Sequence, residues 1–232
     1  MLNRGLLAGA LLVAHAVAIQ AQLAVPADAL ARQVDSIANQ VLQSTGVPSA
    51  SVAIVKNGRL AYANAYGAAK LEPRVTATPD MRYAIGSISK QFTAVAILLL
   101  QQDGKLKLDD PVSRFIPSLT RGNEVTVGQL LSHTSGYQDF WPQDYVMPMM
   151  LQATTPQAIA DQWARKPLDF DPGSRWQYSN TNYTLAGMVV EKASGMPFFQ
   201  FVRTRILAPA GLTSAADFDA SPRAANTTGY IR

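Results

Sequence analysis

The first clear pattern of apolar and polar positions predicts an amphipathic helix over residues 27–44. Its apolar positions are Leu30, Val34, Ile37 and Val41. This spacing of three or four residues places them on one face of a helix. Gly46 and Pro48 come next, and both residue types favour the end of a helix. We expect this helix to pack one face against the rest of the fold.

A strand pattern joined by a tight turn follows this helix. Residues 51–56 and 59–66 are β-rich, and Asn57-Gly58 between them is the strongest short-range signal for a β-hairpin. The first strand is apolar on both faces, which predicts a central position in a covered sheet. Because a lone hairpin is only marginally stable, we expect further strands, some of them beyond the end of this chain.

The next pattern predicts a buried helix that follows a sharp turn. Residues 82–85 resemble a short strand, and Gly86 permits an abrupt change of direction. Residues 88–102 are predicted to be helical, with apolar side chains nearly all round, so most sides of this helix should be buried. Asp103-Gly104 should end the helix.

Residues 105–206 have the pattern of an all-helical subdomain made of short helices and loops. Thr155-Pro156 predicts a helix start, because threonine is a good cap and proline is tolerated at the first helical position. Gly195 should close a further helix, and Pro197 should open the next. The order of elements predicts an α+β fold: an antiparallel sheet flanked by helices plus the all-helical subdomain, with the sheet incomplete in this chain.

The first residues predict that the protein is exported. Arg4 precedes the apolar segment 5–19, and small residues follow, with cleavage expected after Ala18 or Ala21. This is the pattern of a signal peptide over residues 1–21, whose apolar segment is shorter than the roughly 20 residues that a bilayer needs. An uncleaved anchor is the alternative. We expect residues 22–232 to be periplasmic or secreted, with no stable membrane span.

Composition narrows the possible chemistry. Apolar residues make up 48% of the 232 residues and charged residues 16%, as in a globular protein with a real core. No basic run accompanies the net charge of +4, so no nucleic-acid partner is predicted. The chain has no cysteine, and one of its two histidines lies in the predicted signal peptide. Thiol catalysis is therefore excluded, and neither a metal nor another cofactor is predicted.

Ser87-Ile88-Ser89-Lys90 is the first candidate for catalysis. In a helix that begins at Ser87, Lys90 lies three residues on and on the same face. A serine hydroxyl is a poor nucleophile until a base takes its proton, and a lysine buried beside it can be that base. The helix N-terminus would also favour a developing oxyanion. Alone, the tetrapeptide is more typical of a helix cap followed by a solvated lysine. A solvated lysine, however, fits poorly on a helix as apolar as this one.

Tyr178-Ser179-Asn180 is the second candidate. It follows the turn at Pro172-Gly173 and lies at the start of a predicted helix. A tyrosine can relay a proton if a nearby ammonium stabilises its phenolate. An asparagine can present its amide to a substrate carbonyl or orient the lysine. The alternative is a packed tyrosine followed by an N-cap asparagine.

Together, the two motifs, about ninety residues apart, resemble those of class C β-lactamases, D-Ala-D-Ala carboxypeptidases and family VIII esterases. The resemblance covers about residues 30–230. Further matching segments are Lys-Leu-Asp-Asp-Pro at 107–111, Leu-Leu-Ser-His-Thr-Ser-Gly at 130–136, Pro172-Gly173 and Gly187. The resemblance implies a serine hydrolase that forms an acyl-enzyme with a β-lactam, a D-amino-acid peptide or an ester. An esterase of the same fold, or a penicillin-recognising or cell-wall-binding protein without turnover, would share these motifs.

The resemblance also implies roles for the site residues. Ser87 would be acylated, Lys90 would accept or relay its proton, and Tyr178 would act as general base and later as general acid. Which of Lys90 and Tyr178 is the base stays open, because a coupled pair need not have one answer. Asn180 would contact the substrate amide, and His133 would be a structural loop residue.

One family motif is missing from this chain. The third motif, Lys-Ser/Thr-Gly or His-x-Gly on a later strand, has no match, and we assign the similar Lys192-Ala193-Ser194-Gly195 to a helix end. That strand also supplies the second amide of the oxyanion hole in the family. We therefore expect a C-terminally truncated domain that is a poor catalyst by itself.

Overall fold

The computed structural model describes residues 27–141, 152–218 and 227–228. The chain divides into two compact units, residues 1–84 with 218–232 and residues 85–217. The predicted signal peptide lies outside the described residues. Among those described, no helix combines the length and the apolar character needed to cross a membrane.

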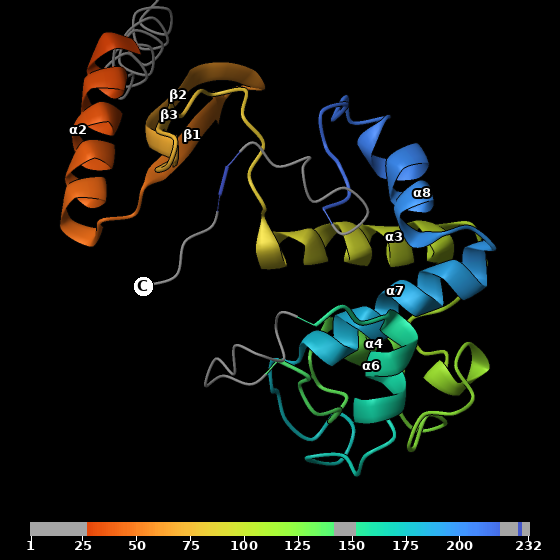
Figure 1. The fold of residues 1–232 in the computed structure, drawn as a ribbon. Helices are drawn as coiled ribbons and strands as arrows, with labels where there is room; N and C mark the ends of the chain where they lie inside the picture. Colours follow the sequence, from red (N-terminus) through yellow and green to blue (C-terminus); the bar gives the residue numbers. More distant parts are fainter. Residues whose placement is uncertain (1–26, 142–151, 219–226, 229–232) are drawn as a thin grey trace, which may run out of the picture. The chain divides into compact units, whose positions relative to one another are not determined.

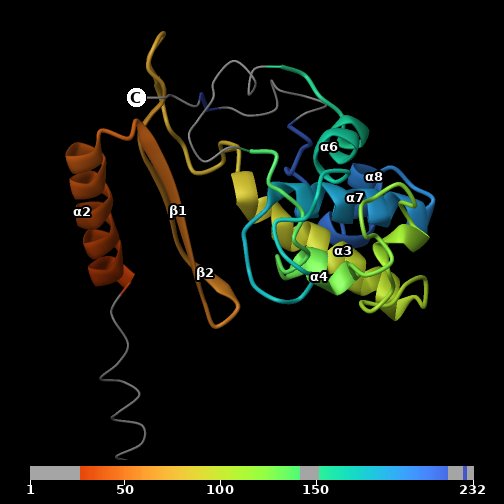
Figure 2. The same cartoon turned by 90° about the horizontal axis from the view of Figure 1, so that it is seen from below.

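The first unit is a helix packed against a small antiparallel sheet (Figures 1 and 2). Helix α2, Ala27–Thr45, contacts the sheet mainly through β2. The strands are β1 (Ser49–Lys56), β2 (Arg59–Lys70) and β3 (Val75–Thr76), in the order β1-β2-β3. The predicted helix and the predicted hairpin are therefore both confirmed.

The hairpin turn has the geometry that Asn-Gly favours. Asn57 and Gly58 have φ angles of 52° and 72°. Two positive values define a type I′ turn, whose twist matches that of the flanking strands. The resulting antiparallel register places Lys56 opposite Arg59.

A carboxylate on α2 ties the helix to the sheet. Asp35 Oδ1 accepts hydrogen bonds from the hydroxyls of Tyr62 and Tyr66, at 2.5 and 2.7 Å, and from the Asn64 amide at 3.2 Å. These three residues alternate along β2, so they share one face of the strand. The hydrogen bonds from Tyr62 and Tyr66 hold the pKa of Asp35 below its ordinary value.

Three details of the sheet differ from the prediction. β1 lies at the edge of the described sheet and not at its centre, because β2 pairs with β1 on one side and with β3 on the other. β2 continues past residue 66 to Lys70, where it meets the two-residue strand β3. Residues 82–85 form no strand, and Gly86, with a φ of 51°, leads directly into a 3₁₀ turn.

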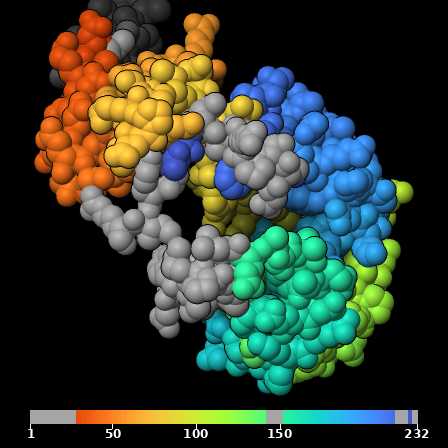
Figure 3. Space-filling model, viewed as in Figure 1, coloured from red at the N-terminus to blue at the C-terminus, as the bar shows by residue number. Residues whose placement is uncertain are grey.

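The second unit is helical. It begins with the 3₁₀ turn η1 (Gly86–Ser89), which continues as α3 (Lys90–Gln102). The following elements are η2 (Val112–Arg114), α4 (Val127–Leu131), α6 (Pro156–Trp163), α7 (Asn180–Ser194), α8 (Phe198–Val202) and η3 (Arg203–Leu207). In Figure 3, the green and blue residues of this unit form a closely packed body.

Helix α7 lies at the centre of this unit. It packs against α3, α4, α6 and α8, and its Leu185 and Val189 side chains are fully buried. Full burial of such a side chain contributes about 1.5–3 kcal/mol. The helix ends at Gly195, whose φ of 71° is left-handed, as its sequence predicts. The predicted start of α6 is also confirmed, because Thr155 Oγ1 accepts the N–H of Ala158.

Helix α3 is less buried than its sequence predicts. Ala96, Ile97 and Leu100 are buried, but Val95 and Leu98 are 40% and 48% exposed. The main contacts of α3 are with α7, so one side of the helix is packed among the described residues. An apolar pattern all round a helix shows where it could be covered, but not which sides are covered.

Candidate active site

The 3₁₀ turn before α3 determines how Ser87 and Lys90 face each other. Ser87 lies in η1 and Lys90 begins α3, so the α-helix starts two residues later than the predicted range of 88–102. The N–H of Lys90 bonds to the carbonyls of Ile88 and Ser87, as in a tightened first turn. Side chains at i and i+3 eclipse each other in 3₁₀ geometry. This geometry brings the Lys90 side chain over Ser87.

Ser87, Lys90 and Tyr178 converge at this turn. Ser87 Oγ lies 2.8 Å from Lys90 Nζ and 2.7 Å from the Tyr178 hydroxyl oxygen. Both distances lie within the hydrogen-bond reach of roughly 2.6–3.2 Å that proton transfer among the three groups requires. Ser87 is exposed, whereas Lys90 and Tyr178 are half-buried. The serine is therefore open to solvent and lies beside two groups that could take its proton.

Asn180, the first residue of α7, completes the cluster. Its Oδ1 accepts a hydrogen bond from Lys90 Nζ at 2.8 Å and a longer one from the Tyr178 hydroxyl at 3.4 Å. Ser179, in extended conformation, occupies the N-cap position of α7. The alternative of a capping asparagine is therefore wrong. Each of the four predicted site residues contacts at least two of the others.

The environment of Tyr178 favours its phenolate. Burial by itself would raise the pKa of Tyr178. Hydrogen bonds with Lys90 and Ser87, together with the positive charge of Lys90, outweigh burial and hold the pKa of Tyr178 below its ordinary value near 10. A phenolate is thus more available here than on a free tyrosine, which is the property a general base needs.

His133 packs against the ring of Tyr178. Its ring packs against the rings of Tyr178 and Tyr183, with centroid distances of 4.7 and 5.2 Å. Burial, followed by the charge of Lys90, lowers the pKa of His133, so its Nδ1 is free to accept the Ser179 N–H at 3.2 Å. The contacts fit the structural role that the resemblance implies for His133.

The loop that contains His133 continues into a segment bonded to the first turn of α7. The hydrogen bonds are Ser135 Oγ to Asn182 Oδ1 (2.6 Å), Phe140 N to Thr181 Oγ1 (3.0 Å) and Asn180 N to Asp139 Oδ1 (2.9 Å). Three successive residues of α7 therefore hold this loop in place.

Asp139 is a site residue that the sequence analysis missed. Besides the Asn180 N–H, its carboxylate accepts hydrogen bonds from Asn180 Nδ2 at 3.3 and 3.2 Å and from the Trp141 N–H at 3.2 Å. The only signal in the sequence is its place three residues after Gly136, just beyond the loop motif. Nothing local predicts that it lies beside a residue 41 positions later.

Gly136 fixes the other side of this loop. Its φ is 84°, and a Cβ there would lie 2.3 Å from the carbonyl oxygen of Phe170. The Asp169 N–H donates to the Gly136 carbonyl at 2.9 Å. Only glycine allows so close an approach in this conformation.

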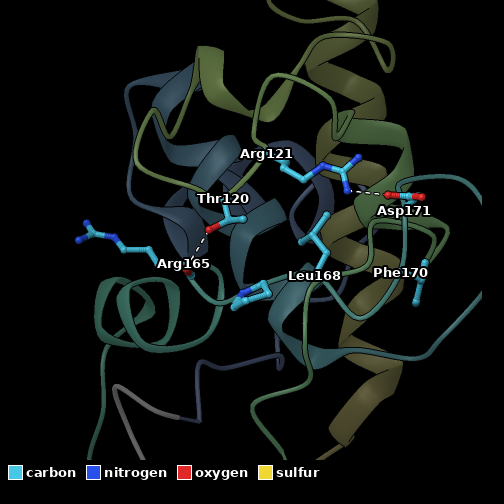
Figure 4. A pocket seen from close by; sticks show the side chains of 7 residues that line it. Thr120, Arg121, Arg165, Leu168, Phe170 and Asp171 are labelled. Carbon is cyan, nitrogen blue, oxygen red and sulfur yellow. Dashed lines mark hydrogen bonds and ion pairs between the residues drawn. The ribbon is translucent and has the colours of Figure 1, made fainter.

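A cavity of about 510 Å³ lies elsewhere in the helical unit (Figure 4). Its lining residues are Thr120, Arg121, Arg165, Pro167, Leu168, Phe170 and Asp171. Arg121 pairs with both Glu124 and Asp171 at 2.6 Å, and Arg165 pairs with Asp161 at 2.6 Å. Both arginines thus already have ion-pair partners within this chain.

One further prediction concerns the end of α7. Residues 192–195 form the last turn of α7 and its Gly195 cap, so their assignment to a helix end is confirmed. Within the described part of the chain, no three His, Cys, Asp or Glu side chains cluster as metal ligands would.

The fold and the site together define a protein of the β-lactamase and transpeptidase fold class. An antiparallel sheet, a helical unit, and a Ser-Lys-Tyr cluster at the start of two helices are its features. The Beta-lactamase family model matches residues 34–231. The chain therefore belongs to the Beta-lactamase family.

Curated relatives are longer than this chain. Protein flp of Staphylococcus aureus (strain NCTC 8325 / PS 47) is 33% identical over 190 residues, which are 78% of this chain and 37% of the relative. Penicillin-binding protein 4* of Bacillus subtilis (strain 168) is 33% identical over 164 residues, or 70% of this chain and 36% of that protein. The chain thus spans little more than a third of these relatives.

Solved structures with the same fold include enzymes of two kinds. A class C β-lactamase in complex with cefoxitin is 27% identical, with a TM-score of 0.71 over 85% of this chain and 55% of its own. D-amino acid amidase from Ochrobactrum anthropi SV3, complexed with L-phenylalanine amide, is 31% identical, with a TM-score of 0.71 over 80% of this chain and 52% of its own.

Proposed function

We propose that the protein is a serine hydrolase that works through an acyl-enzyme on Ser87. The observation that carries the proposal is the contact of one exposed serine hydroxyl with both Lys90 Nζ and the Tyr178 hydroxyl. The lowered pKa of Tyr178 supports it, because a base is most effective when its pKa approaches the working pH.

Acylation follows from these contacts. Ser87 Oγ attacks the substrate carbonyl carbon, a C–O bond forms, and the carbonyl π electrons move to its oxygen. The Ser87 proton passes to the Tyr178–Lys90 pair, which shares it. The tetrahedral intermediate then collapses, the bond to the leaving group breaks, and Tyr178 returns the proton to that group.

Deacylation repeats the sequence with water. Tyr178 takes a proton from a water molecule, whose oxygen attacks the acyl carbon, and Ser87 leaves with a proton returned by Tyr178. Asn180 contacts the substrate amide while its Oδ1 orients Lys90. We propose a β-lactam, a D-amino-acid peptide or amide, or an ester as substrate, since β-lactamases and a D-amino acid amidase share the fold.

Labelling experiments test the proposal. A fluorophosphonate and a fluorescent penicillin should each modify Ser87, and Ser87→Ala should abolish the modification without lowering the melting temperature. Ser89→Ala is the matched control, because Ser89 is an exposed serine of the same turn and should leave labelling intact. An adduct mapped to Ser89 or Ser179 would refute the assignment of the nucleophile.

Turnover assays distinguish the substrate classes. Hydrolysis of a chromogenic cephalosporin, of D-phenylalanine amide and of a p-nitrophenyl ester should be measured in parallel. Labelling by penicillin without turnover of any of these is expected of a penicillin-recognising protein, and also of a hydrolase chain without the third motif.

We also propose that the protein acts outside the cytoplasm. The support is the signal-peptide pattern of residues 1–21, with Arg4 before an apolar segment. N-terminal sequencing of protein from the periplasm or the medium should find a start near Ile19 or Gln22. An intact Met1 in the membrane fraction would favour an uncleaved anchor.

A further inference from the structure

Asn180 can support Lys90 only in one orientation of its side-chain amide. Its Oδ1 accepts the hydrogen bond from Lys90 Nζ at 2.8 Å, and its Nδ2 faces the carboxylate of Asp139 at 3.2–3.3 Å. If the amide turned over, its NH₂ group would face the Lys90 ammonium, and two donors cannot bond to each other. A group on the Nδ2 side that accepts hydrogen bonds and donates none therefore reinforces the orientation that Lys90 favours.

Asp139 is such a group. An ionised carboxylate is acceptor-only, so it can bond to the Nδ2 face of the amide and not to the Oδ1 face. We propose that Asp139 is a positioning residue for the acylation of Ser87, because its carboxylate holds the Asn180 amide oxygen toward Lys90. This inference rests on the proposed function and concerns a residue that touches Asn180 and not the reacting atoms.

The carboxylate is itself held in place. The Trp141 N–H donates to Asp139 Oδ1 at 3.2 Å. On either side, Ser135 bonds to Asn182 and the Phe140 N–H bonds to Thr181. The loop that carries Asp139 is thus fixed to the first turn of α7. The carboxylate is therefore already ordered before a substrate binds.

A purely structural role for Asp139 is the competing explanation. Its Oδ1 also accepts the backbone N–H of Asn180 at 2.9 Å, and an acid at this point stabilises a helix start. Asp139→Asn separates the two roles. The isosteric amide keeps one oxygen for the Asn180 N–H, but it can bond to either face of the Asn180 side chain, so only Lys90 then favours the useful orientation.

The experiment measures the rate of fluorophosphonate labelling of Ser87 in the 232-residue chain, with thermal unfolding measured alongside. Asp139→Asn should label about tenfold more slowly or worse, as expected for the loss of a charge-assisted hydrogen bond. Asp109→Asn removes the same charge at an exposed position outside the cluster and should label at the parent rate. At a pH above the limb set by Tyr178, Asn180→Ala and the double variant Asp139→Asn/Asn180→Ala should label at equal rates, because Asp139 positions the reacting groups through Asn180.

The pH profile gives a second readout, which reports the charge of Asp139 near Tyr178 and not the orientation of the Asn180 amide. The groups that face Tyr178 are Ser87, Lys90, His133, Asn180, Tyr183 and, at longer range, Asp139. The negative charge of Asp139 raises the pKa of Tyr178. Asp139→Asn should therefore move the alkaline limb of the labelling rate to lower pH, while Asp109→Asn should leave it unchanged.

The outcomes separate the inference from the function it rests on. Parent-rate labelling of Asp139→Asn would overturn the inference alone. A double variant that labels more slowly than Asn180→Ala would also overturn the inference, because the effects of the Asp139 and Asn180 substitutions would then be independent. Absence of Ser87 labelling in the parent chain would overturn the proposed function and this inference with it.

Discussion

Replacing Gly136 by alanine should destabilise the helical unit more than its small size suggests. At a φ of 84°, alanine pays a conformational cost of about 1–2 kcal/mol. Its Cβ would lie 2.3 Å from the Phe170 carbonyl oxygen, so this backbone segment must move. The movement would break the hydrogen bond from Asp169 N to Gly136 O, which contributes about 1 kcal/mol. The sum is about 2–3 kcal/mol of unfolding free energy.

Thermal unfolding followed by circular dichroism measures this loss. For a chain of this size, about 2–3 kcal/mol corresponds to a melting temperature lower by about 4–12 °C. Gly104→Ala is the matched control, because Gly104 has a φ of 70° but no heavy atom within 4 Å of the added Cβ. Gly104→Ala therefore measures the part of the stability loss that comes from the left-handed backbone conformation alone. If the two variants melted at the same temperature, the close approach at Gly136 would carry no energetic weight and the reasoning would be refuted.

Three further changes test the site and its support. Tyr178→Phe should slow labelling of Ser87 by a factor of about 10²–10⁴, the usual contribution of a general base, and leave the melting temperature unchanged. A labelling rate near that of the parent would exclude Tyr178 as the base. In the parent chain, the labelling rate should rise with pH along a limb whose midpoint lies below 10, because the pKa of Tyr178 is lowered, and this limb should be missing from Tyr178→Phe. Thr126→Ala should lower the unfolding free energy by about 1 kcal/mol, because Thr126 Oγ1 accepts the Gln129 N–H at the start of α4, whereas Thr126→Ser should restore most of it in a denaturant titration.

The parts of the fold predicted from the sequence are those with local signals. The Asn57-Gly58 turn, the Thr155 cap and the Gly195 helix end each depend on a few neighbouring residues. The two-residue strand β3 has no such signal, because it exists only through pairing with β2. The edge position of β1 likewise depends on which strands pair, which a strand's own apolar pattern does not reveal.

The candidate site divides in the same way. Ser87 and Lys90 were predicted together because their spacing of three is a property of one turn, although that turn is 3₁₀ and not α-helical. Tyr178 and Asn180 required a resemblance to known proteins, since nothing local joins them to a serine about ninety residues away. Asp139 was missed because its role depends on hydrogen bonds to another element of the chain.

The central position of α7 has a consequence for how this site could be altered. A helix is a stiff rod that rises about 1.5 Å per residue, so Val189 in the core lies about 14 Å along the axis from Asn180 in the site. A core substitution that shifts the rod would shift Asn180 by a similar amount and misalign it with Lys90. Trp176 is 64% exposed and lies two residues before Tyr178, outside the helix, where its ring meets the edge of His133. Redesign of substrate preference is therefore better begun at exposed positions such as Trp176 than in the interior of the helical unit.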